Sequence, residues 1–329
     1  MTQLVTNKTI RLDYIDLAKG VMILLVVAGH IIQCYFIRGE QEPLHAFIYG
    51  FHMPLFFLLS GYVMGVTQLK MQQQPYLKWL GRKVQTLLIP YVVWRLFVYR
   101  FIDPSGQSPL DLEALRMLIH NSLDGGAWFL MSLFCIQFVC YPVFKFDKIW
   151  AWAVPIGFLA AGMLLGGDFF YCNPYHYLSF LAGFAIFKYR DKVLCPEVAT
   201  MGFAFFVLSE LIYPNPIFLT ISLASMLLYI CMQIQDVYEG KVKPYLYKRM
   251  SLIGQYTMAI YLLHVLLVFP IVMQNIDVSS YRQTPILVIT IVISFLVALI
   301  CVGIAKAIAF LPLMNFILFG KKIKNVKSK

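Results

Sequence analysis

Long apolar runs separated by short charged or Pro/Gly-rich segments dominate the sequence. A bilayer core of about 30 Å needs about 20 apolar residues per helix, so each run predicts one membrane-spanning helix. The expected runs are at approximately 19–37, 45–67, 84–102, 127–146, 149–166, 174–188, 196–213, 216–235, 254–274 and 285–312. The fifth to seventh runs are short or are interrupted by glycine and proline. The pattern therefore predicts an all-α polytopic membrane protein with about ten transmembrane helices.

The composition supports this fold class. The chain is 60% hydrophobic and 13% charged, with a mean hydropathy of +0.74, whereas about a quarter of the residues of a soluble domain are charged. A water-soluble fold of 329 residues is thereby excluded. We expect one membrane-embedded domain over 1–329 whose last part, 313–329, is a basic cytoplasmic tail. A basic, aromatic stretch within 68–83 predicts a helix at the membrane surface.

The formal charge of +11 is distributed unevenly along the chain. If ten spans alternate, 21 of the 27 basic residues fall in segments on the same side as the N-terminus. Cytoplasmic segments are enriched in Lys and Arg, so both termini are predicted to be cytoplasmic in the inner (plasma) membrane, and 103–126 to be external. This placement excludes a nucleic-acid-binding surface as the reason for the charge. There is no Cys-x-x-Cys pair, so no metal site is expected.

Ionisable side chains inside the expected spans are candidates for function, because burial of a charge or polar ring is costly there, and four of them stand out. His30 lies eleven residues beyond Lys19, which places it about 16 Å into the membrane, near the midplane. His264 is expected near the same depth, His52 in the outer half, and Arg95 in the third helix. A histidine in a membrane helix is often a structural hydrogen-bond partner. Together, however, these residues could line one polar cavity in which an imidazole acts as a general base.

Five stretches of the chain resemble, in order, the motifs of the acyltransferase 3 family. They are DLAKG and VVAGH at 16–20 and 26–30, FHMPLFFLLSGY at 51–62, LLIPY at 87–91, WFL at 128–130, and YLLH at 261–264. The His-Met-Pro version is most similar to the branch named for fucose 4-O-acetylase. The resemblance implies an enzyme that takes an acyl group, usually acetyl, from cytoplasmic acyl-coenzyme A and delivers it to a sugar hydroxyl.

The resemblance also suggests roles for individual residues. His30 is the expected base or a transiently acylated residue, and His52 and Arg95 are candidates for oxyanion stabilisation or acceptor orientation. Many relatives carry Arg-x-x-Arg before the LLIPY motif, but here those two positions are Lys83 and Thr86. The expected donor-binding residues are Lys19, Lys78, Arg82 and Lys83. The expected acceptor-binding residues are Tyr91, Trp94, Trp128 and His264, although aromatic residues near membrane interfaces are more often anchors at the interface.

Two other functions fit parts of the pattern. Ten helices with buried polar residues also describe a transporter or exporter of a polysaccharide or small polar solute, although the two halves of the chain show no evident similarity. The chain could also be an accessory protein that has lost its chemistry, which intact His30 and His52 disfavour. The expected partners are membrane lipid and a carbohydrate acceptor, with acetyl-coenzyme A or another acyl-coenzyme A as co-substrate, and no metal or nucleic acid.

Overall fold

The computed structural model describes residues 12–95, 127–164, 173–212, 216–269, 276–278 and 283–321. These residues form helices and connecting segments, and the β-pairing in this part of the chain is an isolated bridge between Phe36 and Ile276. The all-α prediction is therefore confirmed for the described residues. The expected external loop 103–126 and the end of the basic tail lie outside them.

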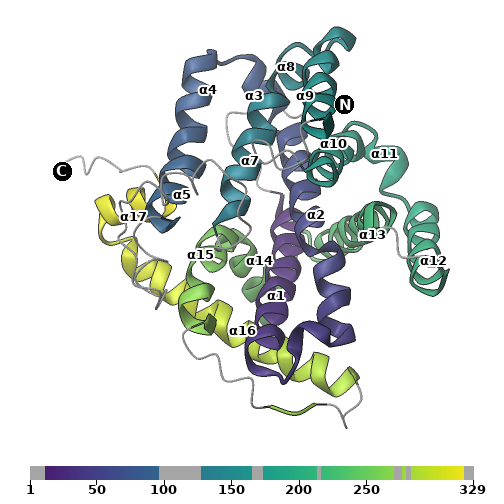
Figure 1. Ribbon diagram of the computed structural model, residues 1–329, viewed down its shortest axis with the longest axis vertical. Helices are drawn as coiled ribbons and strands as arrows, with labels where there is room; N and C mark the ends of the chain where they lie inside the picture. Colours follow the sequence, from purple (N-terminus) through teal and green to yellow (C-terminus); the bar gives the residue numbers. More distant parts are fainter. Residues whose placement is uncertain are drawn as a thin grey trace.

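Two consecutive helices, α1 (Asp13–Tyr35) and α2 (Pro43–Val66), lie at the centre of the molecule (Figure 1). Acidic residues in the first turn of α1 suit the positive end of its dipole, and a proline begins α2 where no backbone N–H is needed. A short 3₁₀ turn, Gly39–Gln41, joins the helices and reverses the chain. The motifs of the first two runs are thereby placed side by side.

Helix α10 (Pro174–Lys188) packs closely on α2 through two glycines. A Cβ atom on Gly61 would lie 1.8 Å from the carbonyl oxygen of Phe180, and one on Gly183 would lie 1.8 Å from that of Leu58. Small residues allow membrane helices to approach each other in this way, because packing rather than water exclusion drives their association.

The ninth apolar run is not one continuous helix. Helix α14 (Tyr245–Gln255) and helix α15 (Thr257–Val268) meet at Tyr256 with an angle of 84°. The expected run 254–274 therefore begins two residues before this break, and its described helical part is α15. Irregular backbone at membrane depth is tolerated where it lines a cavity, and residues on both sides of this break do line one.

The third apolar run, 84–102, follows the stretch 68–83 in which a helix at the membrane surface was expected. Helices α3 (Gln68–Gln72) and α4 (Tyr76–Lys83) precede a π-helical turn, Val84–Leu88, and helix α5 (Ile89–Val93). Wider turns of this kind appear where the regular hydrogen-bond ladder is interrupted, as it is before Pro90. Helix α17 (Pro312–Phe319) packs on α5, so the described part of the expected basic tail is a docked helix.

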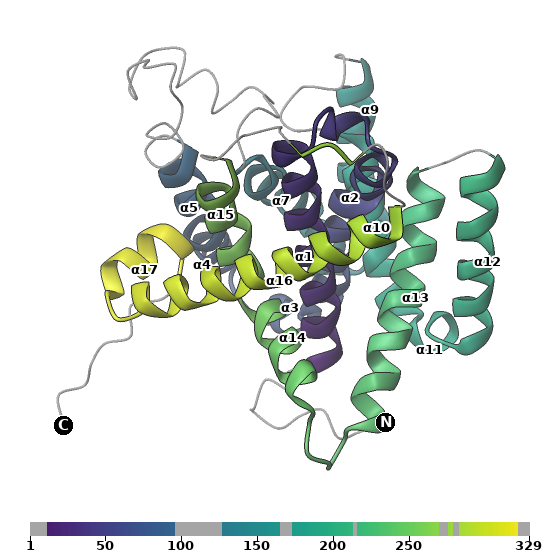
Figure 2. The same cartoon turned by 90° about the horizontal axis from the view of Figure 1, so that it is seen from below.

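The remaining helices surround this centre. Helix α12 packs on α13 at the edge of the molecule, and α16 runs across α1 and α15 (Figures 1 and 2). Their bounds are α7 (Trp128–Val139), α8 (Tyr141–Phe146), a 3₁₀ turn (Ile149–Trp152), α9 (Ala153–Leu164), α11 (Arg190–Val193), α12 (Pro196–Ile212), α13 (Pro216–Val237) and α16 (Gln283–Ile308).

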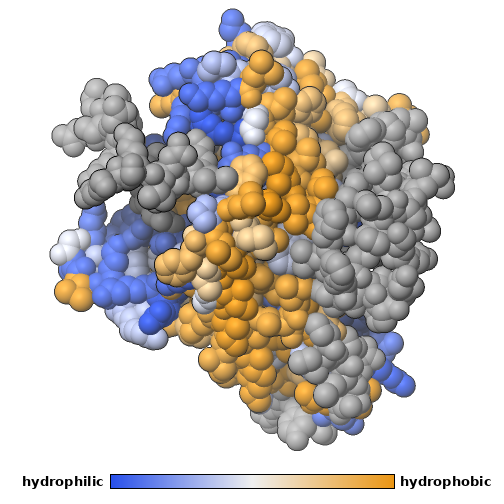
Figure 3. Space-filling model, turned by 90° about the vertical axis from the view of Figure 1, so that its left-hand side faces the viewer, coloured by the Kyte–Doolittle hydropathy of each residue, from blue (hydrophilic) through white to orange (hydrophobic). Residues whose placement is uncertain are grey.

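The outer surface is typical of a membrane protein. Four described helices are long and apolar enough to cross a bilayer, and α14 with α15 would make a fifth as one bent span. A continuous hydrophobic area covers much of one side, with hydrophilic residues gathered beside it (Figure 3). Apolar surface of this extent marks contact with lipid or a partner. The total of about ten spans stays a prediction.

Candidate functional site

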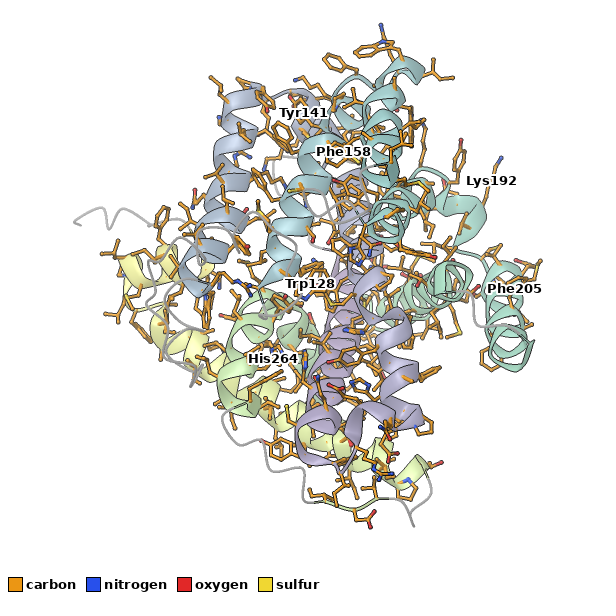
Figure 4. The ribbon with its side chains drawn as sticks, in the orientation of Figure 1. Trp128, Tyr141, Phe158, Lys192, Phe205 and His264 are labelled. Atoms are coloured by element: carbon orange, nitrogen blue, oxygen red, sulfur yellow. The ribbon has the colours of Figure 1, made fainter. Side chains whose placement is uncertain are left out.

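Three histidines from different helices converge near the centre of the molecule. The ring centres of His30 on α1 and His264 on α15 are 5.2 Å apart, and Tyr49 on α2 lies 5.8 Å from His30 and 4.7 Å from His52. Tyr49 and His52 share a helix face because they are three residues apart. His264 lies where α15 packs on α1 (Figure 4). We call His30, Tyr49, His52 and His264 the histidine group.

Hydrogen bonds define which nitrogen carries the hydrogen in two of these rings. Nδ1 of His52 donates to the carbonyl of Ile48 at 2.9 Å, and Nδ1 of His264 donates to that of Ile260 at 2.9 Å. A carbonyl oxygen only accepts, so each Nδ1 carries the hydrogen and each Nε2 keeps a lone pair when the ring is neutral. Nε2 of His264 is buried and has no hydrogen-bond partner among the described residues. It is available to accept a hydrogen bond from a bound molecule.

A cavity of about 240 Å³ lies on the cytoplasmic side of the histidine group, assuming the predicted topology. Tyr261 lines it one turn before His264, with 6.2 Å between the two ring centres, and Met53 lines it next to His52. Its other lining residues are Lys19, Phe56, Leu59, Ser60, Leu87, Phe129, Leu130, Leu133, Gly254, Gln255, Thr257 and Met258. Mostly apolar walls with a few polar groups are typical of small-molecule sites.

Cations lie near this cavity on the predicted cytoplasmic side. Burial and the neighbouring Arg82 guanidinium lower the pKa of Lys83 to about 8, and its Nζ lies 5.9 Å from the centre of the Trp79 ring. Nζ of Lys321 lies 4.6 Å from the ring centre of Tyr256, the residue at the helix break, and partial desolvation lowers the pKa of Lys321. Among the described carboxylates, none forms an ion pair with Arg82, Lys83 or Lys321.

The end of α17 positions Lys321 close to the third run. Nε2 of Gln85 donates to the carbonyl of Gly320 at 3.0 Å, and a Cβ on Gly320 would meet the backbone of Thr86. Gly320 has a φ of +61°, which favours glycine. Lys83 lies one turn before Thr86, so two separate segments bring cations to the same region. Sequence reasoning assigned Lys321 only to the tail and did not find this arrangement.

The other predicted residues lie in different surroundings. Trp94 is buried and donates its indole N–H to the carbonyl of Leu318 at 2.8 Å, so it contacts α17. Trp128 stacks with His176 at 5.4 Å between ring centres, and His176 stacks on Phe57 at 4.4 Å. The remaining residues are placed as follows: Tyr91 is buried, Arg95 is half-buried at the end of the described segment, and Lys78 is exposed on α4.

The structure therefore brings some of the predicted residues together and separates others. His30, His52 and His264 form one group, and Lys19 lines the adjoining cavity. Their catalytic and binding roles stay predictions. The predicted site residues did not include Tyr49, Gln255 or Tyr261, although Tyr49 lies one helical turn before His52 and Tyr261, within the YLLH motif, one turn before His264. That spacing was the available signal.

Comparisons with known proteins agree with the motifs. Residues 12–306 match the model of the acyltransferase 3 family, described as an acyltransferase domain. The nodulation protein NolL of Mesorhizobium japonicum is 26% identical over 176 residues, which cover 50% of this chain and 46% of that protein. NolL of Sinorhizobium fredii is 28% identical over 202 residues, which cover 57% and 52%. The chain thus spans about half the length of these curated relatives, and no solved structure matches it. Because the family model covers the chain almost from end to end, the protein belongs to the acyltransferase 3 family.

Proposed function

We propose that this protein is a membrane O-acyltransferase that moves an acyl group, acetyl in the first instance, from cytoplasmic acyl-coenzyme A to a hydroxyl of a cell-surface or lipid-linked carbohydrate. The observation that carries the proposal is the histidine group beside a largely apolar cavity in a chain of this family. In this proposal the protein is a single multi-pass domain of the plasma membrane with both termini cytoplasmic.

Acyl transfer to an alcohol needs a base for the hydroxyl proton and donors for the developing oxyanion. In the proposed reaction, Nε2 of His30 takes the proton while the acceptor oxygen attacks the thioester carbonyl. The carbon–sulfur bond then breaks, and the thiolate takes the proton back from the imidazolium. The products are the sugar ester and free coenzyme A. His264 orients the acceptor hydroxyl through its unpaired Nε2, and His52 with Arg95 stabilises the oxyanion or orients the acceptor.

The donor would enter from the cytoplasmic side. Its phosphates would contact four cationic side chains, because cations form strong hydrogen bonds with anionic groups. These side chains are Lys78, Arg82, Lys83 and, in addition to the predicted set, Lys321. The uncharged thioester end would occupy the cavity past Lys19, whose side chain is in the lining. Tyr91, Trp94 and Trp128 stay candidate acceptor contacts, although the present packing of both tryptophans against protein groups favours structural roles for them.

The decisive test is transfer of label from radiolabelled acetyl-coenzyme A to lipid-linked glycans by purified protein in lipid nanodiscs. We expect transfer by the native chain and a 10²- to 10⁴-fold lower kcat for His30→Ala, the usual contribution of a positioned base. His264→Ala should retain more activity than His30→Ala. Thr290→Val on α16 is the matched control. It removes a buried hydroxyl that donates to the carbonyl of Ile286 in the same helix at 2.6 Å.

Each variant should be compared per folded, inserted molecule. Loss of the His30 ring removes a polar group from a membrane helix and should not impair insertion. A native chain that transfers no label to any glycan, while moving glycan across vesicles, would instead support the exporter function. Near-native turnover by His30→Ala would exclude His30 as the base.

A further inference from the structure

His30 differs from the other two histidines in how its Nδ1 is held. His52 and His264 use carbonyl groups of their own helices, whereas Nδ1 of His30 faces two side chains. It lies 2.9 Å from the hydroxyl of Tyr49 and 3.2 Å from Oε1 of Gln33. The tautomer of His30 therefore depends on which of these groups donates and which accepts.

A carboxylate at the surface fixes the direction of these hydrogen bonds. Nε2 of Gln33 donates to Oε1 of Glu40 at 2.8 Å, and Glu40 is exposed in the turn between α1 and α2. An ionised carboxylate only accepts, so the amide nitrogen of Gln33 must face it. The carbonyl oxygen of the same amide must then face His30 and Tyr49. The orientation follows from the partners and not from the shape of the amide, whose two ends are similar.

The hydrogens can then be assigned. Oε1 of Gln33 accepts from the hydroxyl of Tyr49 at 3.0 Å, which uses the single hydrogen of that hydroxyl. Neither Oε1 of Gln33 nor the tyrosine oxygen has a hydrogen left to give to His30. Both contacts of the His30 ring are hydrogen bonds only if its Nδ1 donates. Neutral His30 thus carries its hydrogen on Nδ1 and a lone pair on Nε2.

We propose that Gln33 and Glu40 are positioning residues that hold His30 in the tautomer in which Nε2 can accept a proton. The inference rests on the proposed function, in which Nε2 is the base. The same partners suit the imidazolium, because Nδ1–H donates in both protonation states. If the Gln33 amide were turned around, its N–H groups would face Nδ1 of His30. Nδ1 would then have to accept, so the ring hydrogen would move to Nε2, and Nε2 would lose its lone pair. A residue at the outer surface thereby controls the protonation of a ring inside the membrane.

Exchange of the two residues provides the sharpest test. In the double variant Gln33→Glu/Glu40→Gln, the new carboxylate accepts from His30 and Tyr49, and the new amide donates to it, so the pattern at His30 is preserved. Glu40→Gln alone allows the Gln33 amide to face either way. Gln33→Glu alone places two carboxylates against each other, which is unfavourable. Gln33→Leu removes the acceptor. Gln41→Leu in the same turn is the control, because that side chain is exposed and outside the network.

We expect kcat to fall roughly 3- to 10-fold in Glu40→Gln and 10-fold or more in Gln33→Leu, with the KM of the donor unchanged, since the loss is one oriented hydrogen bond that acts through the base. The double variant should recover to within about threefold of the native kcat. Gln41→Leu should equal the native protein. ¹⁵N NMR of histidine-labelled protein, with His30→Ala for assignment, should show His30 protonated at Nδ1 in the native and double variants.

The outcomes separate this inference from the proposed function. An inactive native protein, or an active His30→Ala variant, overturns both. An active native protein whose double variant is no better than either single variant overturns the positioning role alone. The same holds if Gln33→Leu lowers only the yield of folded protein, or if the NMR spectrum places the hydrogen of His30 on Nε2.

Discussion

The contact between α14 and α1 leaves no space for a side chain at Gly254. A Cβ atom there would lie 1.7 Å from the carbonyl oxygen of Asp16, whereas real Cβ atoms essentially never come closer than 3.0 Å. In Gly254→Ala the two backbones would have to separate by more than 1 Å along a helix contact that also includes Gly20 and Met250. Overpacking costs about 1–3 kcal/mol where side chains can yield, so a clash between backbones should cost at least about 3 kcal/mol.

The unfolding free energy of Gly254→Ala should be measured by steric trapping in bicelles, together with turnover per folded molecule. Gly303→Ala on α16 is the control, because its Cβ would meet nothing within 4 Å. It should be neutral or more stable by up to about 1 kcal/mol, through the better helix propensity of alanine. Gly254 also lines the cavity, so turnover should fall with stability. If Gly254→Ala were as stable as Gly303→Ala, the close packing of α14 on α1 would be refuted.

Two further predictions concern the third run. The pKa of Lys83 is lowered to about 8, so its side chain is charged below this pH and neutral above it. The KM for the donor should therefore rise above about pH 8. The variant Lys83→Arg stays charged and should remove that rise. Titration of the native and variant KM against pH checks this, and a flat native profile would contradict it. Trp94→Phe should lose about 1 kcal/mol of stability, through the hydrogen bond to Leu318, and leave the KM for the acceptor unchanged. A raised acceptor KM would instead indicate that Trp94 contacts the sugar.

The relative heights of polar residues along neighbouring helices could be predicted from the sequence, because a helix advances by a constant rise per residue. Counting His30 from Lys19 and His264 from the start of the ninth run predicted that both lie at one level, and the structure places their rings 5.2 Å apart. Depth does not specify rotation about the helix axis or the choice of neighbouring helix. The stacking of Trp128 on His176, which comes from a distant part of the chain, is one neighbour that the sequence did not predict.

Other features depend on contacts between segments far apart in the sequence. No proline in the sequence marks the break at Tyr256. The break lies next to the close packing of Gly254 on α1. The docking of α17 includes a hydrogen bond from the indole N–H of Trp94 to the carbonyl of Leu318, which lies more than two hundred residues away in the sequence. The hydrogen bond from Gln33 to Glu40 requires the chain to reverse after α1. Patterns of hydropathy describe single helices and do not contain these pairings.

In the proposed topology, the break between α14 and α15 also shortens the apolar helix that crosses this part of the membrane. Helix α15 has 12 residues and is about 18 Å long, well short of the hydrocarbon thickness of about 30 Å. In that topology, the break would replace part of the apolar barrier on the predicted cytoplasmic side. Charged groups are costly in hydrocarbon, so in the proposed reaction a thinner barrier would allow the phosphates of the donor to stay hydrated while its neutral thioester travels a shorter distance to the histidines.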